Sequence, residues 1–226
     1  MARPADTQLR LALDREPDFR RDQFVISESN FRAVSMVDAW PAWPNGVIAV
    51  VGPEGSGKTH LARAWAARAG ATIANPLKLV AGRLPNGPVL LDDWESDVAD
   101  EGLFHLLNRT DPGASVLLTS RLAPRLWATA LPDLRSRLNA IVTVELGVPD
   151  DLLLQGVLLK LFRDKNIRPD GDLLGYLLRR IERSVRAAET IVARLDEAAG
   201  AGGREVTRAL AREVLEGDDS NGDLFA

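Results

Sequence analysis

The stretch VVGPEGSGKTHLARAW, residues 50–65, decides the fold of this 226-residue chain. It contains the pattern G-x-x-x-x-G-K-T between Gly52 and Thr59, with the apolar run VIAVV (47–51) before it and a helical pattern over 58–69 after it. Glycines let the backbone bend so that consecutive N–H groups point at phosphate oxygens, and the N-terminus of the following helix adds partial positive charge. The sequence therefore predicts a site for a nucleoside di- or triphosphate.

The residues of this loop have separate predicted tasks. Lys58 is expected to reach the β and γ phosphates, and the Thr59 hydroxyl to ligate Mg²⁺. The residues predicted to surround ADP or ATP are Pro53, Glu54, Gly55, Ser56, Gly57, Lys58, Thr59 and His60. A glycine-rich turn that merely precedes a lysine is the alternative, and the flanking strand and helix argue against it.

Two carboxylates follow the apolar run VLL and complete the predicted magnesium site. Asp92 is expected to hold the metal through water, and Asp93 to position or deprotonate an attacking water. The alternative is a strand-ending turn, which an Asp-Asp pair also suits.

Alternation of strands and helices predicts an α/β fold with a parallel sheet in three layers. A helix capped by Ser29 or Asn30 is expected to end near Ala39. The other predicted strands lie in ATIAN, PVLLDD, SVLLTS and AIVTVEL, and the helical patterns between them cover 58–69, about 99–109 and about 124–130.

From Pro149 onward the pattern becomes purely helical and predicts a small all-α lid. The predicted apolar faces are Leu153, Val157, Leu158 and Leu161, then Leu173, Tyr176, Leu177 and Ile181, then Val185, Ala188, Val192 and Leu195. GAGG at 200–203 is expected to end the third helix, and TRALAREVL forms a fourth. The predicted organisation is an arm (1–21), a nucleotide-binding α/β domain (22–148), a helical lid (149–216) and an acidic tail (217–226).

Composition narrows the class of protein further. Apolar residues make up 46% and charged residues 27%, which is typical of a globular protein with a substantial core. The chain has no cysteine and only two histidines, so a zinc site is not expected. A net charge of −4 argues against coating of nucleic acid, and no apolar run is long enough to span a membrane, so a cytoplasmic protein is expected.

The arm contains QLRLAL at residues 8–13, in which leucines alternate with other residues. Leu9, Leu11 and Leu13 would fall on one side of an extended chain. This pattern suits either an edge strand or a peptide that inserts its leucines into a groove of another protein.

An ordered set of motifs resembles a known family. QFVISESN, GSGKTHLARA, LLDDW, LLTSR and LRSRL, followed by a helical segment with SVRAAE, look like the AAA+ module of the bacterial replication initiator DnaA, over roughly residues 22–216. The resemblance implies that Arg137 is an arginine finger reaching the nucleotide of a neighbouring subunit, and that Arg186 is the sensor 2 arginine at the phosphates of its own subunit. Phe24 and Val25 match the segment that packs on the adenine. Taken alone, Arg137 and Arg186 could each be ordinary surface arginines.

The chain departs from the initiators after LTS, where they carry an acidic sensor and this sequence has Arg121. The polar sensing role then falls to Thr119 or Ser120, and at most slow hydrolysis by the chain itself is expected. Residues 60–91 have no room for the two-helix insertion that grips single-stranded DNA. The helix-turn-helix domain of initiators is also expected to be missing, so sequence-specific DNA binding is not expected.

QLRLAL is similar to the Q-L-x-L-x-L peptide with which Hda proteins bind the sliding clamp of the replicase. The resemblance implies that Gln8 bonds the clamp backbone while the three leucines fill apolar pockets. A clamp peptide joined to an initiator-like AAA+ module resembles the Hda family, which inactivates DnaA by stimulating its ATP hydrolysis. The alternatives are a loader-type adaptor and a self-contained P-loop ATPase or small-molecule kinase, and self-association stays open.

Overall fold

The computed structural model describes residues 19–75, 79, 84–94, 100–109 and 114–219, so the predicted clamp peptide at 8–13 lies outside the described residues. Its centre is a five-stranded sheet in which the strands run in the order β2-β3-β4-β1-β5. All four neighbouring pairs are parallel. The strands are β1 (Val47–Val51), β2 (Thr72–Ile73), β3 (Val89–Leu91), β4 (Val116–Ser120) and β5 (Val142–Glu145).

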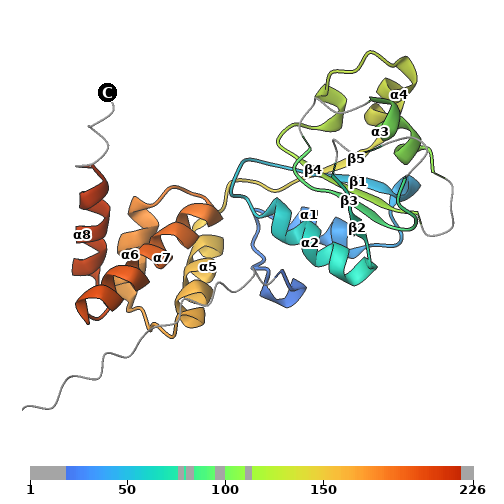
Figure 1. The fold of residues 1–226 in the computed structure, drawn as a ribbon. Helices are drawn as coiled ribbons and strands as arrows, with labels where there is room; N and C mark the ends of the chain where they lie inside the picture. The colour runs from blue at the N-terminus through green and yellow to red at the C-terminus, as the bar shows by residue number, and fades with distance from the viewer. Residues whose placement is uncertain (1–18, 76–78, 80–83, 95–99, 110–113, 220–226) are drawn as a thin grey trace, which may run out of the picture.

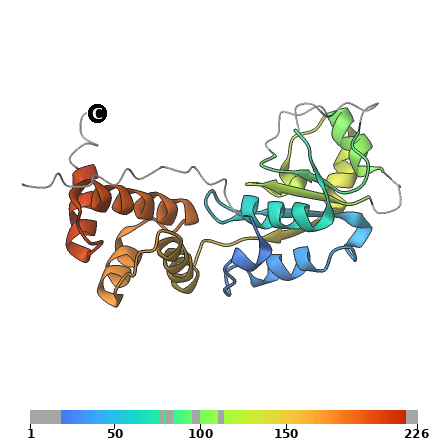
Figure 2. The same ribbon diagram turned by 60° about the horizontal axis from the view of Figure 1, so that its bottom comes forward.

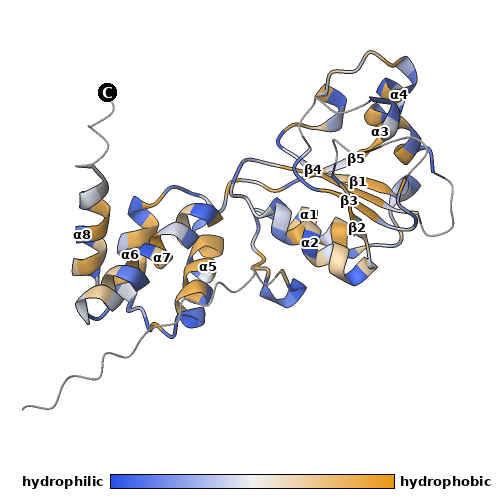
Figure 3. Cartoon of the chain, in the orientation of Figure 1, coloured by the Kyte–Doolittle hydropathy of each residue, from blue (hydrophilic) through white to orange (hydrophobic). Residues whose placement is uncertain are grey.

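Helices cover both faces of this sheet, which confirms the predicted three-layer α/β fold (Figures 1 and 2). Side chains alternate along β1, so Ile48 and Val50 pack against α1 (Phe31–Asp38) and α2 (Lys58–Ala69). Ala49 and Val51 face the opposite way, into the cluster formed with α3 (Asp100–Leu107) and α4 (Pro132–Ala140). The central strands are mostly apolar because both faces are covered (Figure 3).

The register of the strands brings their carboxyl ends to one edge of the sheet. Val51 pairs with Ser120 of β4 and with Glu145 of β5. Leu91 pairs with Leu118. The phosphate loop after β1, the carboxylates after β3 and the polar end of β4 therefore meet at this edge.

One predicted helix was wrong. Residues 124–130 form only a short 3-10 turn, η4 (Pro124–Leu126), and the α-helix begins later, with Pro132 as its first residue. Trp127 is extended and buried, stacks on Trp94 with ring centroids 5.4 Å apart, and donates its indole N–H to the Leu122 carbonyl. These contacts fix the segment in a non-helical path that the local apolar pattern does not reveal.

The C-terminal part consists of four helices with a core of their own. They are α5 (Asp151–Asp164), α6 (Gly171–Arg180), α7 (Val185–Gly202) and α8 (Arg208–Asp219). The predicted apolar faces meet in this core, with Leu158, Leu173, Leu177 and Leu195 fully buried. Helix α7 ends at Gly203, which has a left-handed backbone, and α8 extends three residues into the segment expected to be a tail.

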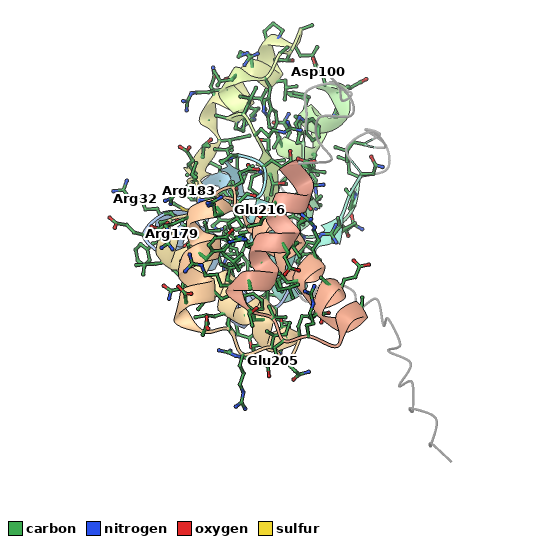
Figure 4. The ribbon with its side chains drawn as sticks, turned by 90° about the vertical axis from the view of Figure 1, so that its left-hand side faces the viewer. Arg32, Asp100, Arg179, Arg183, Glu205 and Glu216 are labelled. Atoms are coloured by element: carbon green, nitrogen blue, oxygen red, sulfur yellow. The ribbon has the colours of Figure 1, made fainter. Side chains whose placement is uncertain are left out.

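Charged side chains lie on the outside of both parts of the molecule. Arg32 of α1 and Glu205 before α8 point outward (Figure 4). Among the helices that the structure describes, none is both long and apolar enough to cross a membrane.

Asp150 connects the sheet domain to the helical part. It caps α5 by accepting the Leu153 N–H at 2.7 Å, and its other oxygen accepts the Ser29 N–H at 3.2 Å from the start of α1. Desolvation acts to raise the pKa of Asp150, but hydrogen bonds from Leu153, Ser27 and Ser29 outweigh it and hold the pKa below its ordinary value. The charged carboxylate is thus stabilised by segments on both sides of the junction.

Asp150→Ala should destabilise the protein more than Asp170→Ala. Asp170 caps α6 through the equivalent bond to the Leu173 N–H, also 2.7 Å long, and each cap is worth about 1 kcal/mol. Asp150→Ala additionally leaves the Ser29 N–H without this acceptor, so its loss should reach about 2 kcal/mol. Chemical denaturation of both variants measures the difference, and equal losses would contradict a role for Asp150 across the junction.

The advantage of Asp150 over alanine should also depend on pH. Because its folded-state pKa is depressed, the contribution is fully present above about pH 4 and is lost as the pH falls through the folded value. The free energies of unfolding of the wild type and Asp150→Ala should therefore converge on acidification.

Candidate nucleotide-binding site

The loop between β1 and α2 is shaped to receive phosphate. Gly55 has φ +72° and Gly57 φ +96°, a region that side chains rarely adopt. A Cβ at Gly55 would lie 2.6 Å from the Ser184 Cβ, and one at Gly57 would lie 3.3 Å from the Phe24 ring. The two glycines thus allow the loop to turn while Ser184 and Phe24 approach it closely.

Lys58 is folded back onto its own loop. It is 8% exposed, and its Nζ donates to the carbonyls of Gly52 at 2.9 Å and Pro53 at 2.8 Å. Burial lowers its pKa, while the carboxylates of Asp93, Asp92 and Glu54 act to raise it. A buried ammonium held by carbonyls exchanges readily to phosphate oxygens, which are stronger acceptors.

The loop also contains a buried polar atom that suits a phosphate. Ser56 Oγ has no hydrogen-bond partner in the part of the chain that the structure describes. Such atoms normally find a partner. Together with the glycine geometry and Lys58, this fits a nucleotide phosphate bound inside the loop.

Asp92 lies at the centre of a hydrogen-bond network. Its Oδ1 accepts from the hydroxyls of Thr59 at 3.2 Å and Thr119 at 2.8 Å, and its Oδ2 lies 3.5 Å from Arg63 Nε. Thr59 and Asp92, predicted as the Mg²⁺ pair from distant parts of the sequence, are therefore in direct contact.

No cluster of three or more histidines or acidic residues that could hold a metal occurs among the described residues. A hydroxyl and a carboxylate are hard oxygen ligands of the kind Mg²⁺ uses together with waters and substrate phosphates. Thr59 and Asp92 would hold the ion, which would neutralise phosphate charge when bound.

Asp93, the residue after Asp92, has a left-handed backbone conformation. Its φ is +56°, and its N–H donates to Thr119 Oγ1 at 2.7 Å. The Thr119 hydroxyl therefore joins both aspartates, accepting from Asp93 and donating to Asp92. Ser120, the other predicted sensing residue, instead donates to the Leu122 carbonyl at 2.6 Å. Of the two, Thr119 is the one in contact with the predicted metal residues.

The segment expected to contact adenine lies beside the phosphate loop. The Phe24 ring meets the His60 ring edge-on, with centroids 5.3 Å apart, and also lies near Gly57. Val25 points elsewhere and packs against the core of the helical part. Phe24 is thus next to the phosphate loop, whereas Val25 joins this segment to α5 through contact with Gly156.

The helical part touches the phosphate loop through the start of α7. The Val185 N–H donates to the Gly55 carbonyl at 2.8 Å, and the Ser184 side chain lies against Gly55. Arg186, in the first turn of α7, forms an ion pair with Glu54 of the loop. The predicted sensor 2 arginine therefore reaches the loop, on a helix whose N-terminus faces it.

Arg137 lies at the opposite edge of the sheet. It is exposed on α4 and lines a hollow of about 310 Å³ together with Asn45, Val47, Asn108 and Arg109. Val47 begins β1, whereas the phosphate loop follows the last residue of that strand. The structure therefore does not bring Arg137 together with the other predicted site residues.

Three residues at the site were not predicted. Arg63 pairs with Asp92, Ser184 contacts Gly55, and Arg121 lies near enough to Lys58 to act on its pKa. The position of Arg63 could have been predicted from the sequence. It lies four residues after Thr59, a predicted Mg²⁺ ligand, and residues four apart on a helix share a face. The Ser184 contact depends on how the helical part is placed against the loop, which no local pattern reveals.

Thr119→Val should loosen the two aspartates. Valine fills the same volume but removes the acceptor of the Asp93 N–H and a donor to Asp92, at a cost of about 1–3 kcal/mol in stability. Binding of nucleotide with Mg²⁺ should weaken as well, whereas Thr119→Ser should retain both properties. Titration with a fluorescent nucleotide, with and without Mg²⁺, tests this; tight Mg²⁺-dependent binding by the valine variant would contradict it.

Comparison with known proteins relates this arrangement to replication initiators. No family model matches the chain. It is 28% identical over 136 residues to the chromosomal replication initiator protein DnaA of Thermomicrobium roseum, covering 58% of this chain and 29% of that protein. DnaA of Campylobacter jejuni is 24% identical over 231 residues, covering 88% of this chain and 52% of the relative. DnaA of Clavibacter sepedonicus is 25% identical, with 88% and 48% covered. The chain thus spans about half or less of the length of these relatives.

Solved structures agree with this relationship at the level of the fold. Domain III of the Thermotoga maritima replication initiation protein DnaA superposes with a TM-score of 0.75 at 18% identity, covering 89% of this chain and 97% of that one. The Holliday junction branch migration motor RuvB of Thermotoga maritima gives a TM-score of 0.68 at 16% identity, with 87% and 71% covered. The chain is thus similar in sequence to DnaA proteins and has the P-loop AAA+ fold seen in DnaA domain III.

Proposed function

We propose that this protein regulates replication initiation by docking on DnaA and stimulating ATP hydrolysis there, with Arg137 as an arginine finger supplied in trans. The observation that carries the proposal is the position of Arg137. It is an exposed cation at the edge of the sheet opposite to the phosphate loop of its own chain.

The length of β1 supports action on another molecule. The strand has five residues, which is roughly 16 Å at about 3.3 Å per residue, and Arg137 and the loop lie at its opposite ends. An arginine side chain cannot reach across the sheet to its own nucleotide. A guanidinium brought to the nucleotide of a docked partner stabilises charge on the transferring phosphoryl group, and fingers of this kind are worth about 10³–10⁵ in rate.

The surroundings of Arg137 suit a polar, negatively charged partner group. Asn45 and Asn108 line the same hollow as the exposed Arg137, so side-chain amides lie beside the finger. A phosphate group and its neighbouring carboxylates would meet donors here. The similarity to DnaA favours an AAA+ partner, because a module of the same fold would carry its own phosphate loop at the carboxyl end of its sheet, where Arg137 of this chain would have to reach.

In this proposal the nucleotide bound by the chain itself, ADP or ATP with Mg²⁺, stabilises the structure. Lys58, Thr59 and Asp92 would hold it, while contacts of Gly55 with the start of α7 join the loop to the helical part. Binding at the loop then stabilises one angle between the two parts. Clamp binding through Gln8, Leu9, Leu11 and Leu13 would bring the protein to replicating DNA, in the cytoplasm.

Arg137→Ala should abolish stimulation of ATP turnover by the cognate DnaA. The measurement is phosphate release from ATP-bound DnaA with DNA-loaded clamp, comparing the wild type, Arg137→Ala and the control Arg32→Ala, which removes an exposed arginine of α1 (Figure 4). Stimulation should fall by about 10³ or to the unstimulated rate in Arg137→Ala only. Retained binding to DnaA separates loss of the finger from loss of docking. Equal stimulation by all three proteins would overturn the finger.

Disrupting the predicted clamp peptide by substitution should make stimulation of DnaA independent of the clamp. Gln8→Ala combined with Leu9→Ala should lower the stimulated rate to the level seen without clamp, and leave nucleotide binding by this protein unchanged. Clamp binding measured by surface plasmon resonance should be lost in parallel. Undiminished clamp-dependent stimulation would contradict the peptide's role.

A second function is favoured by one observation, the intact network of Thr59, Asp92 and Thr119. These contacts suit a self-contained P-loop ATPase. In the same assay that function would appear as phosphate release by this protein without DnaA, insensitive to Arg137→Ala.

A further inference from the structure

Arg63 of α2 connects the predicted magnesium site to the base of the arm. Its Nε lies 3.5 Å from Asp92 Oδ2, and its guanidinium carbon lies over the Phe19 ring, 4.9 Å from the ring centroid. Phe19 belongs to the predicted arm (1–21) and is the first residue that the structure describes. One cation therefore contacts both the predicted metal carboxylate and the segment through which the arm joins the domain.

The base of the arm is held on α2 by His60. The rings of Phe19 and His60 meet edge-on with centroids 5.6 Å apart, and the Arg20 carbonyl lies 3.2 Å from His60 Nε2. A long arginine side chain in solvent samples many rotamers, and contact with an aromatic face restricts them. Phe19 thus holds the guanidinium of Arg63 beside Asp92.

The contact of Arg63 with Asp92 acts through charge rather than through direction. The Asp92 carboxylate is already oriented by the hydroxyls of Thr119 at 2.8 Å and Thr59 at 3.2 Å. Arg63 Nε is buried and makes no hydrogen bond within the described residues, so its approach to Asp92 is an ion pair without hydrogen-bond geometry. Because the Asp92 side chain is only 12% exposed, solvent screens this pair less than a fully exposed one.

We infer that Arg63 is a built-in counter-cation of Asp92 that partly replaces Mg²⁺, and that Phe19 is the positioning residue that holds it there. The inference rests on the proposed nucleotide and magnesium site and adds the metal requirement of that site. Without Mg²⁺, the guanidinium offsets the charge of Asp92, which would otherwise repel the phosphates. With Mg²⁺, the same guanidinium repels the ion and competes with it for Asp92. Both effects make nucleotide binding less dependent on Mg²⁺.

This arrangement links the metal requirement of the site to the position of the arm. A partner that lifts Phe19 from α2 would free Arg63 to move into solvent, and Mg²⁺ would then bind more tightly beside the nucleotide. Because such coupling is reciprocal, Mg²⁺ bound with the nucleotide would favour release of Phe19 from α2.

The test is the Mg²⁺ enhancement factor, which is the dissociation constant of ADP in EDTA divided by that in saturating Mg²⁺. Isothermal titration calorimetry on the full chain measures both constants. Arg63→Gln removes the charge and should raise the factor by roughly three- to tenfold. Arg63→Lys keeps the charge, so its factor should stay closer to the wild-type value than to that of Arg63→Gln. A variant that merely damaged the site would weaken binding under both conditions without raising the factor.

Arg68→Gln is a matched control on the same helix. Arg68 pairs with Asp38 at 3.5 Å and lies over the Trp40 ring, 5.8 Å from its centroid. Its side chain is 40% exposed, against 42% for Arg63. Asp38 is the last residue of α1 and does not belong to the predicted metal site, so this control should leave the factor at the wild-type value.

Substitution of Phe19 tests the positioning role. Phe19→Leu stays apolar but removes the ring, and should raise the factor about twofold, whereas Phe19→Tyr should not. In an Arg63→Gln background, Phe19→Leu should have no effect on the factor, because no guanidinium is left to position. An unchanged or lower factor in Arg63→Gln, or an equal effect of Phe19→Leu in both backgrounds, would overturn the inference.

These titrations contain neither DnaA nor clamp, so failure of the proposed regulation of DnaA would not change their outcome. Absence of ADP binding by the wild type would overturn the proposed nucleotide site together with this inference. Binding by the wild type with an unchanged factor in Arg63→Gln would overturn the inference alone.

Discussion

The parallel pairing of β1 with β4 sets Val51 opposite Ser120, and the site depends on this register. It places the phosphate loop, which leaves β1, next to Thr119 near the end of β4, and Thr119 in turn holds Asp92 and the Asp93 N–H. A shift by one residue would turn the Thr119 hydroxyl to the other face of the sheet. Such a shift would break the hydrogen bonds of Thr119 with Asp92 and with the Asp93 N–H, so the strand register and the geometry of the site depend on each other.

Charged side chains gather at the carboxyl ends of the strands, around the phosphate loop. The chain as a whole carries −4, yet Lys58, Arg63 and Arg186 lie at these ends. Asp92 and Glu54 partner two of these cations directly. Such a mixed cluster holds its cations in place without a ligand and can exchange carboxylates and carbonyls for phosphate oxygens. This explains how a net acidic protein can present a site for a polyanion.

The two proposed activities lie at opposite ends of the parallel strands. The carboxyl ends are expected to hold this chain's own nucleotide and lie against α7. The amino ends lie near Arg137, which lines a hollow together with Arg109. Because the strands separate these ends rigidly, neither can substitute for the other within one molecule. The proposed regulation of an AAA+ partner by direct docking rests on this separation of Arg137 from the phosphate loop.

The sequence by itself determined the fold class, the phosphate loop and the pair of Thr59 with Asp92, because these follow from a local glycine pattern and from apolar runs that end in polar residues. It misplaced the helix before β5, since Pro132 begins that helix and the burial of Trp127 against Trp94 holds the preceding segment extended. It also missed Ser184 and the bond of Glu54 to Arg186. Only the tertiary structure decided the contact of Ser184 with Gly55 and the bond of Glu54 to Arg186, because each joins segments more than a hundred residues apart and depends on how the helical part lies against the loop.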